Sequence, residues 1–279
     1  LVLFPKTTSA RLFNRVTKAE CIAKFLSLVP LPFRYERYDT YFRNYSQFIL
    51  AEAGIYEGPD NIEEYVRFAT DSSPYLDFFR LRKFDFEWGN FVRVENNTCV
   101  YVVAFINEYE TEPTLAEHKR FRVQAMAKGY MYPDERFIPQ LNIYFTKGYL
   151  NYVFGQLLNT VKTKNYICDV MANACGYDVG VDCVEKLNEL PVAQGDSYVD
   201  GNSYGCRALH ATFAATNPEA HCPHISFEPL PDLDDKIKCQ GSGQVLAIES
   251  LFEQEDLDFF DEVLIKNGFT DAGYEELPL

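Results

Sequence analysis

The sequence predicts an α+β protein in which helices pack on a curved antiparallel sheet, followed by a cysteine-rich extension stapled by disulfides. Three helical patterns come first, a run of strands with short turns follows, and six of the eight cysteines fall between residues 168 and 239. We expect an N-terminal arm over residues 1–17, an α+β domain over 18–165, and a helix-and-loop domain with an acidic last helix over 166–279.

The composition is that of a globular protein. The 279 residues are 47% hydrophobic and 24% charged, and no apolar run reaches the ~18 residues that a membrane span needs. The net charge of −15 argues against affinity for nucleic acids, because such binding depends on Lys and Arg contacts to phosphates. We therefore expect no nucleic-acid partner and no membrane span.

The segment that follows the arm predicts three helices. Thr17 and Glu20 form a capping box at the start of the first helix. A second helix is predicted from Tyr38 to Glu52, where aromatic residues recur at helical spacing and Gly54 is placed to end it. A third, short helix is expected to begin at Asp60.

The hydrophobic period then changes to two, which indicates strands. Because short turns join these strands without intervening helices, the pattern excludes a doubly wound parallel sheet. Asn96 and Asn97 mark the tightest of these turns. The predicted strands cover residues 84–88, 91–95, 98–109, 120–132 and 139–146.

Helical patterns return in the last half of the chain. A helix is expected from Tyr149, and the final helix is expected to begin with a second capping box, Ser250 to Glu253, and to stop at Gly268. This final helix is amphipathic, so we expect it to pack on its own domain; contact with a neighbouring subunit of a homo-oligomer is the alternative. Shorter helices are expected at 166–175, 181–189 and 203–215.

The order of these elements resembles a known superfamily. The aromatic segment from Phe48 to Tyr65, which contains Gly58 and Ile62, followed by a long antiparallel sheet, is similar to the cone-shaped NTF2-like superfamily, including SnoaL-like proteins. The resemblance covers about residues 18–147 and does not extend to the C-terminal part. It implies a cone with an apolar pocket but no particular reaction, because the family includes isomerases, dehydratases and non-enzymatic binders.

In such a cone, six aromatic residues are expected to line a ligand pocket, where tyrosine hydroxyls orient an apolar ligand. The alternative is that the same residues are simply core aromatics. The six are Tyr41, Tyr45, Phe48, Trp88, Tyr101 and Tyr144.

A second candidate site is the sequence from Gly201 to Gly205, which matches the G-x-S-x-G nucleophile elbow with Ser203 as the nucleophile. An elbow also needs an acidic residue before its histidine, and no Asp lies between Ser203 and His224. A helix cap at Ser203 is therefore the alternative interpretation.

A third candidate is a metal site. His210, His221 and His224 lie close together in sequence, and Cys206 is four residues before His210, on the same face of a helix. Because Cys206 and Cys222 are expected in disulfides, we predict no bound metal and no other cofactor.

The cysteines also indicate a compartment. An even, clustered count without a CxxC pair favours disulfides over a zinc ribbon, with the pairing left open. Asn44 and Asn96 begin glycosylation sequons, and Asn96 is the better acceptor because it lies in a predicted turn. We expect a secreted or lumenal glycoprotein, with an organelle as the alternative. The cysteines expected in disulfides are Cys168, Cys175, Cys183, Cys206, Cys222 and Cys239.

The leading hypothesis for function is a non-catalytic binding protein that takes a small apolar ligand in the cone or a protein partner on the sheet. An enzyme is the first alternative, either a SnoaL-like isomerase or dehydratase or a serine hydrolase that uses Ser203. A self-assembling structural protein is the second alternative. A buried, perturbed carboxylate or histidine in a pocket favours the enzyme, and a large exposed apolar patch favours assembly.

Overall fold

The computed structural model describes residues 16–28, 41–51, 54–68, 79–111, 120–132, 137–195, 197–228, 238–240, 246–268 and 274–277. For residues 79–90, 105–109, 111, 121, 123, 147 and 274–277, the description covers the backbone alone. Most of the predicted N-terminal arm lies outside the described residues.

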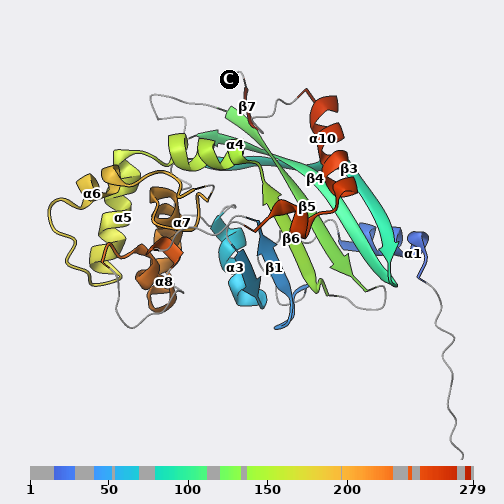
Figure 1. Cartoon of the computed structure of the whole chain (residues 1–279), viewed down its shortest axis with the longest axis horizontal. Helices are drawn as coiled ribbons and strands as arrows, with labels where there is room; N and C mark the ends of the chain where they lie inside the picture. The colour runs from blue at the N-terminus through green and yellow to red at the C-terminus, as the bar shows by residue number, and fades with distance from the viewer. Residues whose placement is uncertain are drawn as a thin grey trace, which may run out of the picture.

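In the described part of the chain, seven strands form one mixed sheet with the order β2-β1-β6-β5-β4-β3 (Figure 1). The predicted antiparallel meander is confirmed for β3 to β6, while β1 runs parallel to β6. Strand β7 pairs with the first residues of β5. The strands are β1 (Gln47–Leu50), β2 (Gly54–Glu57), β3 (Phe79–Glu95), β4 (Thr98–Thr111), β5 (Arg120–Met131), β6 (Gln140–Phe145) and β7 (Tyr274–Leu277).

The helices fall into two groups. Helices α5 to α8 gather beyond one end of the sheet, whereas α1 and α10 lie along it (Figure 1). The helices are α1 (Lys18–Leu28), α3 (Pro59–Phe68), α4 (Lys147–Leu150), the π-helical segment η3 (Asn151–Leu157), α5 (Val161–Asn173), α6 (Cys183–Glu189), α7 (Tyr204–Ala214), α8 (Pro218–Ile225), the 3₁₀ turn η4 (Lys238–Gln240), α9 (Ile248–Leu251) and α10 (Gln254–Lys266).

Local signals locate several of these elements correctly. The Thr17 capping box forms, with the Glu20 carboxylate accepting from the Thr17 backbone N–H at 2.8 Å. The Asn96 and Asn97 turn joins β3 to β4, and both residues have the positive φ angles, 47° and 64°, that a tight hairpin requires. The predicted boundary near residue 165 remains untested.

The predicted helix from Tyr38 to Glu52 is wrong over residues 42–51, although Tyr41 is helical. Residues 47–50 form strand β1, which pairs with both β2 and β6. Phe48 and Ile49 point to opposite faces of the sheet, and both are buried, at 3% and 5% exposed. A strand buried on both faces shows no alternation of apolar and polar residues, so its period resembles part of a helix.

The predicted start of the last helix is also wrong. Ser250 lies in the short helix α9, and α10 begins only after Glu253. The capping box at this point joins Glu253 and Asp256, because each side chain accepts the other residue's backbone N–H. The predicted end is confirmed, since Gly268 follows the helix with a φ of 76°.

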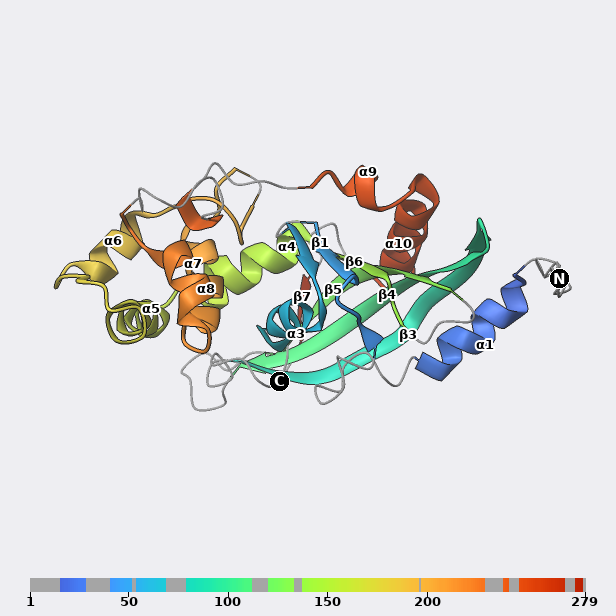
Figure 2. The same ribbon diagram turned by 90° about the horizontal axis from the view of Figure 1, so that it is seen from below.

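Strand β4 separates two apolar clusters of the core, one on each of its faces. Cys99 and Tyr101 point toward α1, while Val100 and Val102 point toward α10, so the chain's own helices cover both faces of the sheet (Figure 2). The Cys21–Cys99 disulfide and a 2.5 Å hydrogen bond from the Tyr101 hydroxyl to the Cys21 carbonyl hold α1 in place.

Helix α10 docks on the sheet of its own chain through an apolar face and a buried ion-pair network, and not on the helix-and-loop domain to which the sequence assigned it. Phe260 and Val263 pack in the apolar cluster with Val100 and Val102. Beside this cluster, the carboxylate of Asp256 is fully buried and accepts from the Lys128 ammonium at 2.9 Å and from the Arg93 guanidinium.

All eight cysteines are paired, which confirms the predicted disulfides of the C-terminal part. Helix α5 is tied to α6 and α8, and η4 is tied to α7. The pairs are Cys21–Cys99, Cys168–Cys183, Cys175–Cys222 and Cys206–Cys239. No helix of the described residues is long and apolar enough to cross a bilayer.

We predict that Asp256→Asn lowers the free energy of unfolding by about 3 kcal/mol at pH 7, because it removes the one fully buried carboxylate of the network and leaves Arg93 and Lys128 with only their more exposed acidic partners. Burial favours a higher pKa for Asp256, but hydrogen bonds from Arg93, Lys128 and the Glu253 backbone lower it overall. This lowered pKa gives the folded state stability that is present above the unfolded pKa of about 3.9 and is lost as the pH falls through the folded pKa.

Denaturant unfolding at pH 7 and near pH 3 tests this prediction, and the gap between wild type and variant is expected to shrink in acid. The control is Asp261→Asn, which makes the same charge change on the exposed face of α10 and is expected to cost less than about 0.5 kcal/mol. Equal losses for the two variants would contradict the role of Asp256.

Candidate functional site

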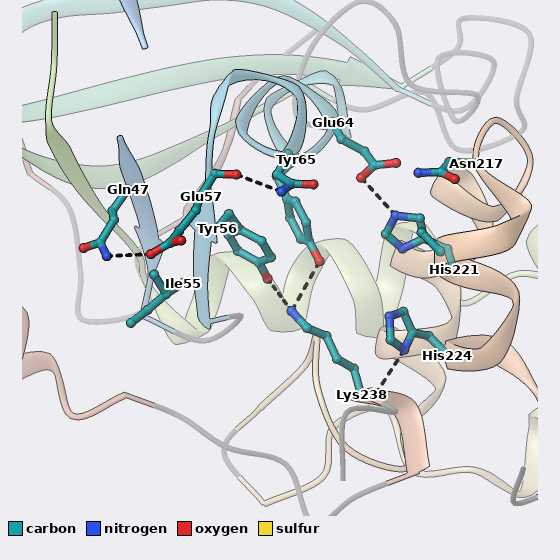
Figure 3. A pocket seen from close by; sticks show the side chains of 12 residues that line it. Gln47, Ile55, Tyr56, Glu57, Glu64, Tyr65, Asn217, His221, His224 and Lys238 are labelled. Carbon is teal, nitrogen blue, oxygen red and sulfur yellow. Dashed lines mark hydrogen bonds and ion pairs between the residues drawn. The ribbon is translucent and has the colours of Figure 1, made fainter. Parts of the chain in front are cut away.

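A pocket of about 600 Å³ lies where the β1–β2 edge of the sheet meets the C-terminal helices (Figure 3). One wall comes from β2 and α3, and the opposite wall from α8 and η4. Polar side chains dominate this lining, which includes Tyr56, Glu64, Tyr65, His221, His224 and Lys238.

Lys238 reaches across the pocket from η4 to α3 and β2. Its ammonium donates to the Tyr56 hydroxyl at 2.8 Å and to the Tyr65 hydroxyl at 3.4 Å (Figure 3). Burial lowers the pKa of Lys238 to about 8, opposed by the nearby Asp200 carboxylate. Burial also raises the pKa values of both tyrosines, so both phenols stay neutral at physiological pH.

Three histidines, His210, His221 and His224, cluster close to Lys238. His210 on α7 is fully buried, and its Nδ1 lies 3.2 Å from Nδ1 of His221 on α8. The other ring nitrogen of His221, Nε2, lies 2.9 Å from the Glu64 carboxylate (Figure 3). His224 accepts the Lys238 backbone N–H at its Nδ1, over 3.2 Å. One ring nitrogen from each histidine lies within 4.8 Å of the others.

Two of these histidines are held neutral. Burial, followed by the neighbouring His224, Lys238 and His221, lowers the pKa of His210 well below its usual value. Burial, followed by His221 and Lys238, lowers the pKa of His224 to about 4. At neutral pH both rings therefore keep a lone pair on one nitrogen.

Two disulfides fix the positions of α8 and η4, which form this wall of the pocket. Cys206 on α7 is bonded to Cys239, the neighbour of Lys238, with Cα atoms 5.6 Å apart. Cys175 is bonded to Cys222, which lies between the two histidines of α8. The cysteines thus hold the elements that carry the polar groups, and none is available as a thiolate ligand.

The structure does not bring the six predicted aromatic residues around one pocket. Tyr41, Phe48 and Tyr101 are buried in the main core, which matches the alternative of core aromatics. Tyr45 is 60% exposed, and Tyr144 packs against Phe260 on the α10 side of the sheet. The side chain of Trp88 lies outside the described residues.

The G-x-S-x-G motif has structural roles. Ser203 is fully buried and is the N-cap of α7, where its hydroxyl accepts the Cys206 backbone N–H at 3.1 Å. Gly205 lies against the segment before it, so a Cβ atom at this position would be 2.2 Å from the Tyr198 carbonyl oxygen. Helix capping and close backbone packing therefore account for the residues of the motif.

The predicted trio His210, His221 and His224 does come together, but sequence analysis missed the other half of the pocket. Lys238 meets Tyr56 across 182 residues of sequence, and Glu64 meets His221 across 157. No local pattern marks such long-range contacts. The one available signal was the concentration of histidines in a short segment.

The comparisons with known proteins cover the chain in parts. Residues 153–229 match the family model described as the BfoA family C-terminal domain, and this segment contains all three clustered histidines, two of which line the pocket. No curated protein matches the chain.

Solved structures are similar over about half of the chain, as the resemblance to SnoaL-like proteins implied. A candidate SnoaL-like polyketide cyclase from Mesorhizobium loti has 15% identity and a TM-score of 0.28, with 47% of this chain and 100% of that chain covered. A candidate isomerase from Bacillus subtilis has 13% identity and a TM-score of 0.32, with 50% and 92% covered. A cystatin-like domain of unknown function from Nostoc punctiforme has 13% identity and a TM-score of 0.29, with 58% and 100% covered. TM-scores this low give no guide to function.

We predict that Ser203→Ala lowers the free energy of unfolding by about 1 kcal/mol, because α7 loses its N-cap. Denaturant unfolding measures this change. The control is Ser250→Ala, since Ser250 is exposed and caps no helix, and its effect is expected to stay within about 0.5 kcal/mol. An unchanged stability for Ser203→Ala, together with loss of an esterase activity, would restore the nucleophile hypothesis.

Proposed function

We propose that the protein is a binding protein that takes a small polar ligand with an anionic group in the pocket between α3 and α8. The single observation that carries this proposal is the buried ammonium of Lys238, which is directed at the pocket by two tyrosine hydroxyls. The volume and concave form suit a small molecule. The apolar ligand and the protein partner on the sheet, expected from the sequence, remain predictions.

The charges around Lys238 favour an anion over a cation. The Glu64 carboxylate is engaged by His221, and the Glu57 carboxylate accepts from the Gln47 amide at 2.9 Å. The Lys238 ammonium therefore donates to two neutral phenols on the pocket side, with the Asp200 carboxylate also nearby, while the two carboxylates that line the pocket are engaged by other side chains. A ligand carboxylate or phosphate would form a charge-assisted hydrogen bond with Lys238 in a partly desolvated site, where such bonds are strongest.

We predict that simple carboxylates or phosphate raise the melting temperature of the chelator-treated protein and that the matched neutral amides do not. Lys238→Met is expected to weaken this binding about 10–100-fold, because a hydrogen bond to a charged group is lost. The control is Lys266→Met, which removes the same charge from the exposed end of α10. Binding that survives Lys238→Met, or a preference for the amides, contradicts the proposal.

An enzyme remains the alternative, and one contact favours it. The 2.9 Å contact between His221 and Glu64 is the arrangement in which a carboxylate orients a histidine base at the wall of a pocket. Turnover lost in Glu64→Gln with ligand binding intact would favour this alternative over a binding protein. The structural-assembly alternative stays a prediction.

We also propose that the protein works in an oxidising compartment, as a secreted or lumenal glycoprotein. Four disulfides support the compartment, because such bonds rarely persist in the cytosol. Asn44 and Asn96 are both exposed, and Asn96 lies at the tip of the β3–β4 hairpin.

Peptide mapping of the protein from its natural source, with and without reduction, is expected to recover the four linkages and a glycan on the peptide that contains Asn96. The reduced sample is the control for each linkage. Free thiols in the unreduced protein would overturn the compartment, and an unmodified Asn96 would overturn the glycosylation.

A further inference from the structure

The three pocket histidines present an arrangement that the ligand-binding proposal does not use. His210 and His221 face each other through Nδ1 atoms that are 3.2 Å apart, and both side chains are buried. His224 lies beside them, with its ring centroid 4.7 Å from that of His210. Nε2 of His210 is buried without a hydrogen-bond partner among the described residues. This leaves a polar atom deep in the fold that the protein's own hydrogen bonds do not satisfy.

The hydrogen bonds determine where the protons of these rings lie. In its neutral form His221 donates from Nε2 to Glu64, because a carboxylate accepts, so Nδ1 of His221 carries the lone pair. That lone pair accepts from Nδ1 of His210, over the 3.2 Å that separates the two Nδ1 atoms. A carboxylate on one nitrogen and a lone pair on the other is the arrangement that orients histidine ligands in metal sites; metal binding here replaces the hydrogen bond between the rings, with the Nδ1 proton of His210 moving to its unpartnered Nε2.

We propose that His210, His221 and His224 bind a divalent transition metal ion of the Zn²⁺ class, with Glu64 as the positioning residue of His221. In a tetrahedral zinc site with Zn–N bonds of about 2.0–2.1 Å, two ligand nitrogens are separated by about 3.3 Å. The 3.2 Å between the two Nδ1 atoms agrees with this separation. The inference goes beyond the proposed function, since it needs no organic ligand.

The remaining donors define the rest of the coordination sphere. Cys206 and Cys239 have ligand atoms within 4.8 Å of a ring nitrogen of His210, but their disulfide removes both thiolates. His224 is therefore the third ligand. Its Nδ1 accepts the Lys238 backbone N–H, so ligation through Nε2 requires the ring proton to move to Nδ1 and that one neutral hydrogen bond to be given up.

Three protein ligands leave a fourth position of a tetrahedral ion open. Because His221 and His224 line the pocket while His210 lies behind them, this position faces the pocket and is open to a water molecule or a small ligand. Open sites with three protein ligands are typical of zinc ions that bind or activate a further molecule, whereas structural zinc sites are closed by four.

The test is a metal titration of the full-length, disulfide-bonded protein after treatment with a chelator, in a buffer free of organic anions. Zn²⁺ is expected to bind one ion per chain and to raise the melting temperature. Co²⁺ is expected to give the absorption bands of a tetrahedral site with nitrogen ligands. Absence of stoichiometric binding by both ions would overturn the proposal.

Variants identify the ligands. His221→Ala is expected to weaken Zn²⁺ binding more than about 100-fold and to abolish the tetrahedral Co²⁺ spectrum, and Glu64→Gln to weaken binding about 10–100-fold while the spectrum is kept. The matched control is His118→Ala, which removes the chain's remaining histidine and is expected to leave affinity and spectrum unchanged. Loss of binding in the control, or unchanged binding in His221→Ala, would overturn the proposal.

Two features keep this test decisive. If circular dichroism shows that His221→Ala fails to fold, Glu64→Gln decides, because Glu64 is 18% exposed and its replacement leaves the buried rings in place. In that case an unchanged Zn²⁺ affinity would overturn the proposal. The anion assay of the proposed function is run on protein freed of metal by chelation and then of the chelator itself, so failure of one proposal is distinguishable from failure of the other.

Discussion

The disulfide pair Cys175–Cys222 and Cys206–Cys239 is the constraint on which the pocket depends. These bonds close loops of 47 and 33 residues. In the chain-entropy model, each lowers the conformational entropy of the unfolded state and so stabilises the folded state by about 4 kcal/mol. They hold α8 against the segment that follows α5 and η4 against α7, although both α8 and η4 are short and η4 has only three residues. Without them, the polar groups opposite α3 would depend on segments too small to bury a core of their own.

Sequence analysis succeeded where the determining interactions are local. The Asn96 and Asn97 turn, the strands on either side of it and helix α3 all follow from residues close together in the chain. It failed at β1, because pairing with β2 and β6 buries both faces of residues 47–50 and removes the alternation that marks a strand. At Glu253, two overlapping capping boxes compete, and the burial of Asp256 selects the second.

The candidate site shows the same division. The histidines were visible in the sequence because α7 and α8 are consecutive helices, which bring His210 and His221 together over a short separation. Lys238 and Tyr56 were not visible, since only the path of the chain around the sheet edge brings them into contact. The motif around Ser203 was visible but misleading, because helix capping and close packing select the same small residues as a nucleophile elbow does.

Because helices lie on both faces of β4, the ways in which another protein can bind the sheet are restricted. Helix α1 lies on one face of this strand and α10 on the other, so the sheet is an inner layer at its centre and offers no broad face there to another molecule. Among the described strands, β2, β7 and the 17-residue β3 each pair on one side only and so form the margins of the sheet. Strand addition at such a margin would join another protein through main-chain hydrogen bonds, with its selectivity set by the side chains that flank the margin.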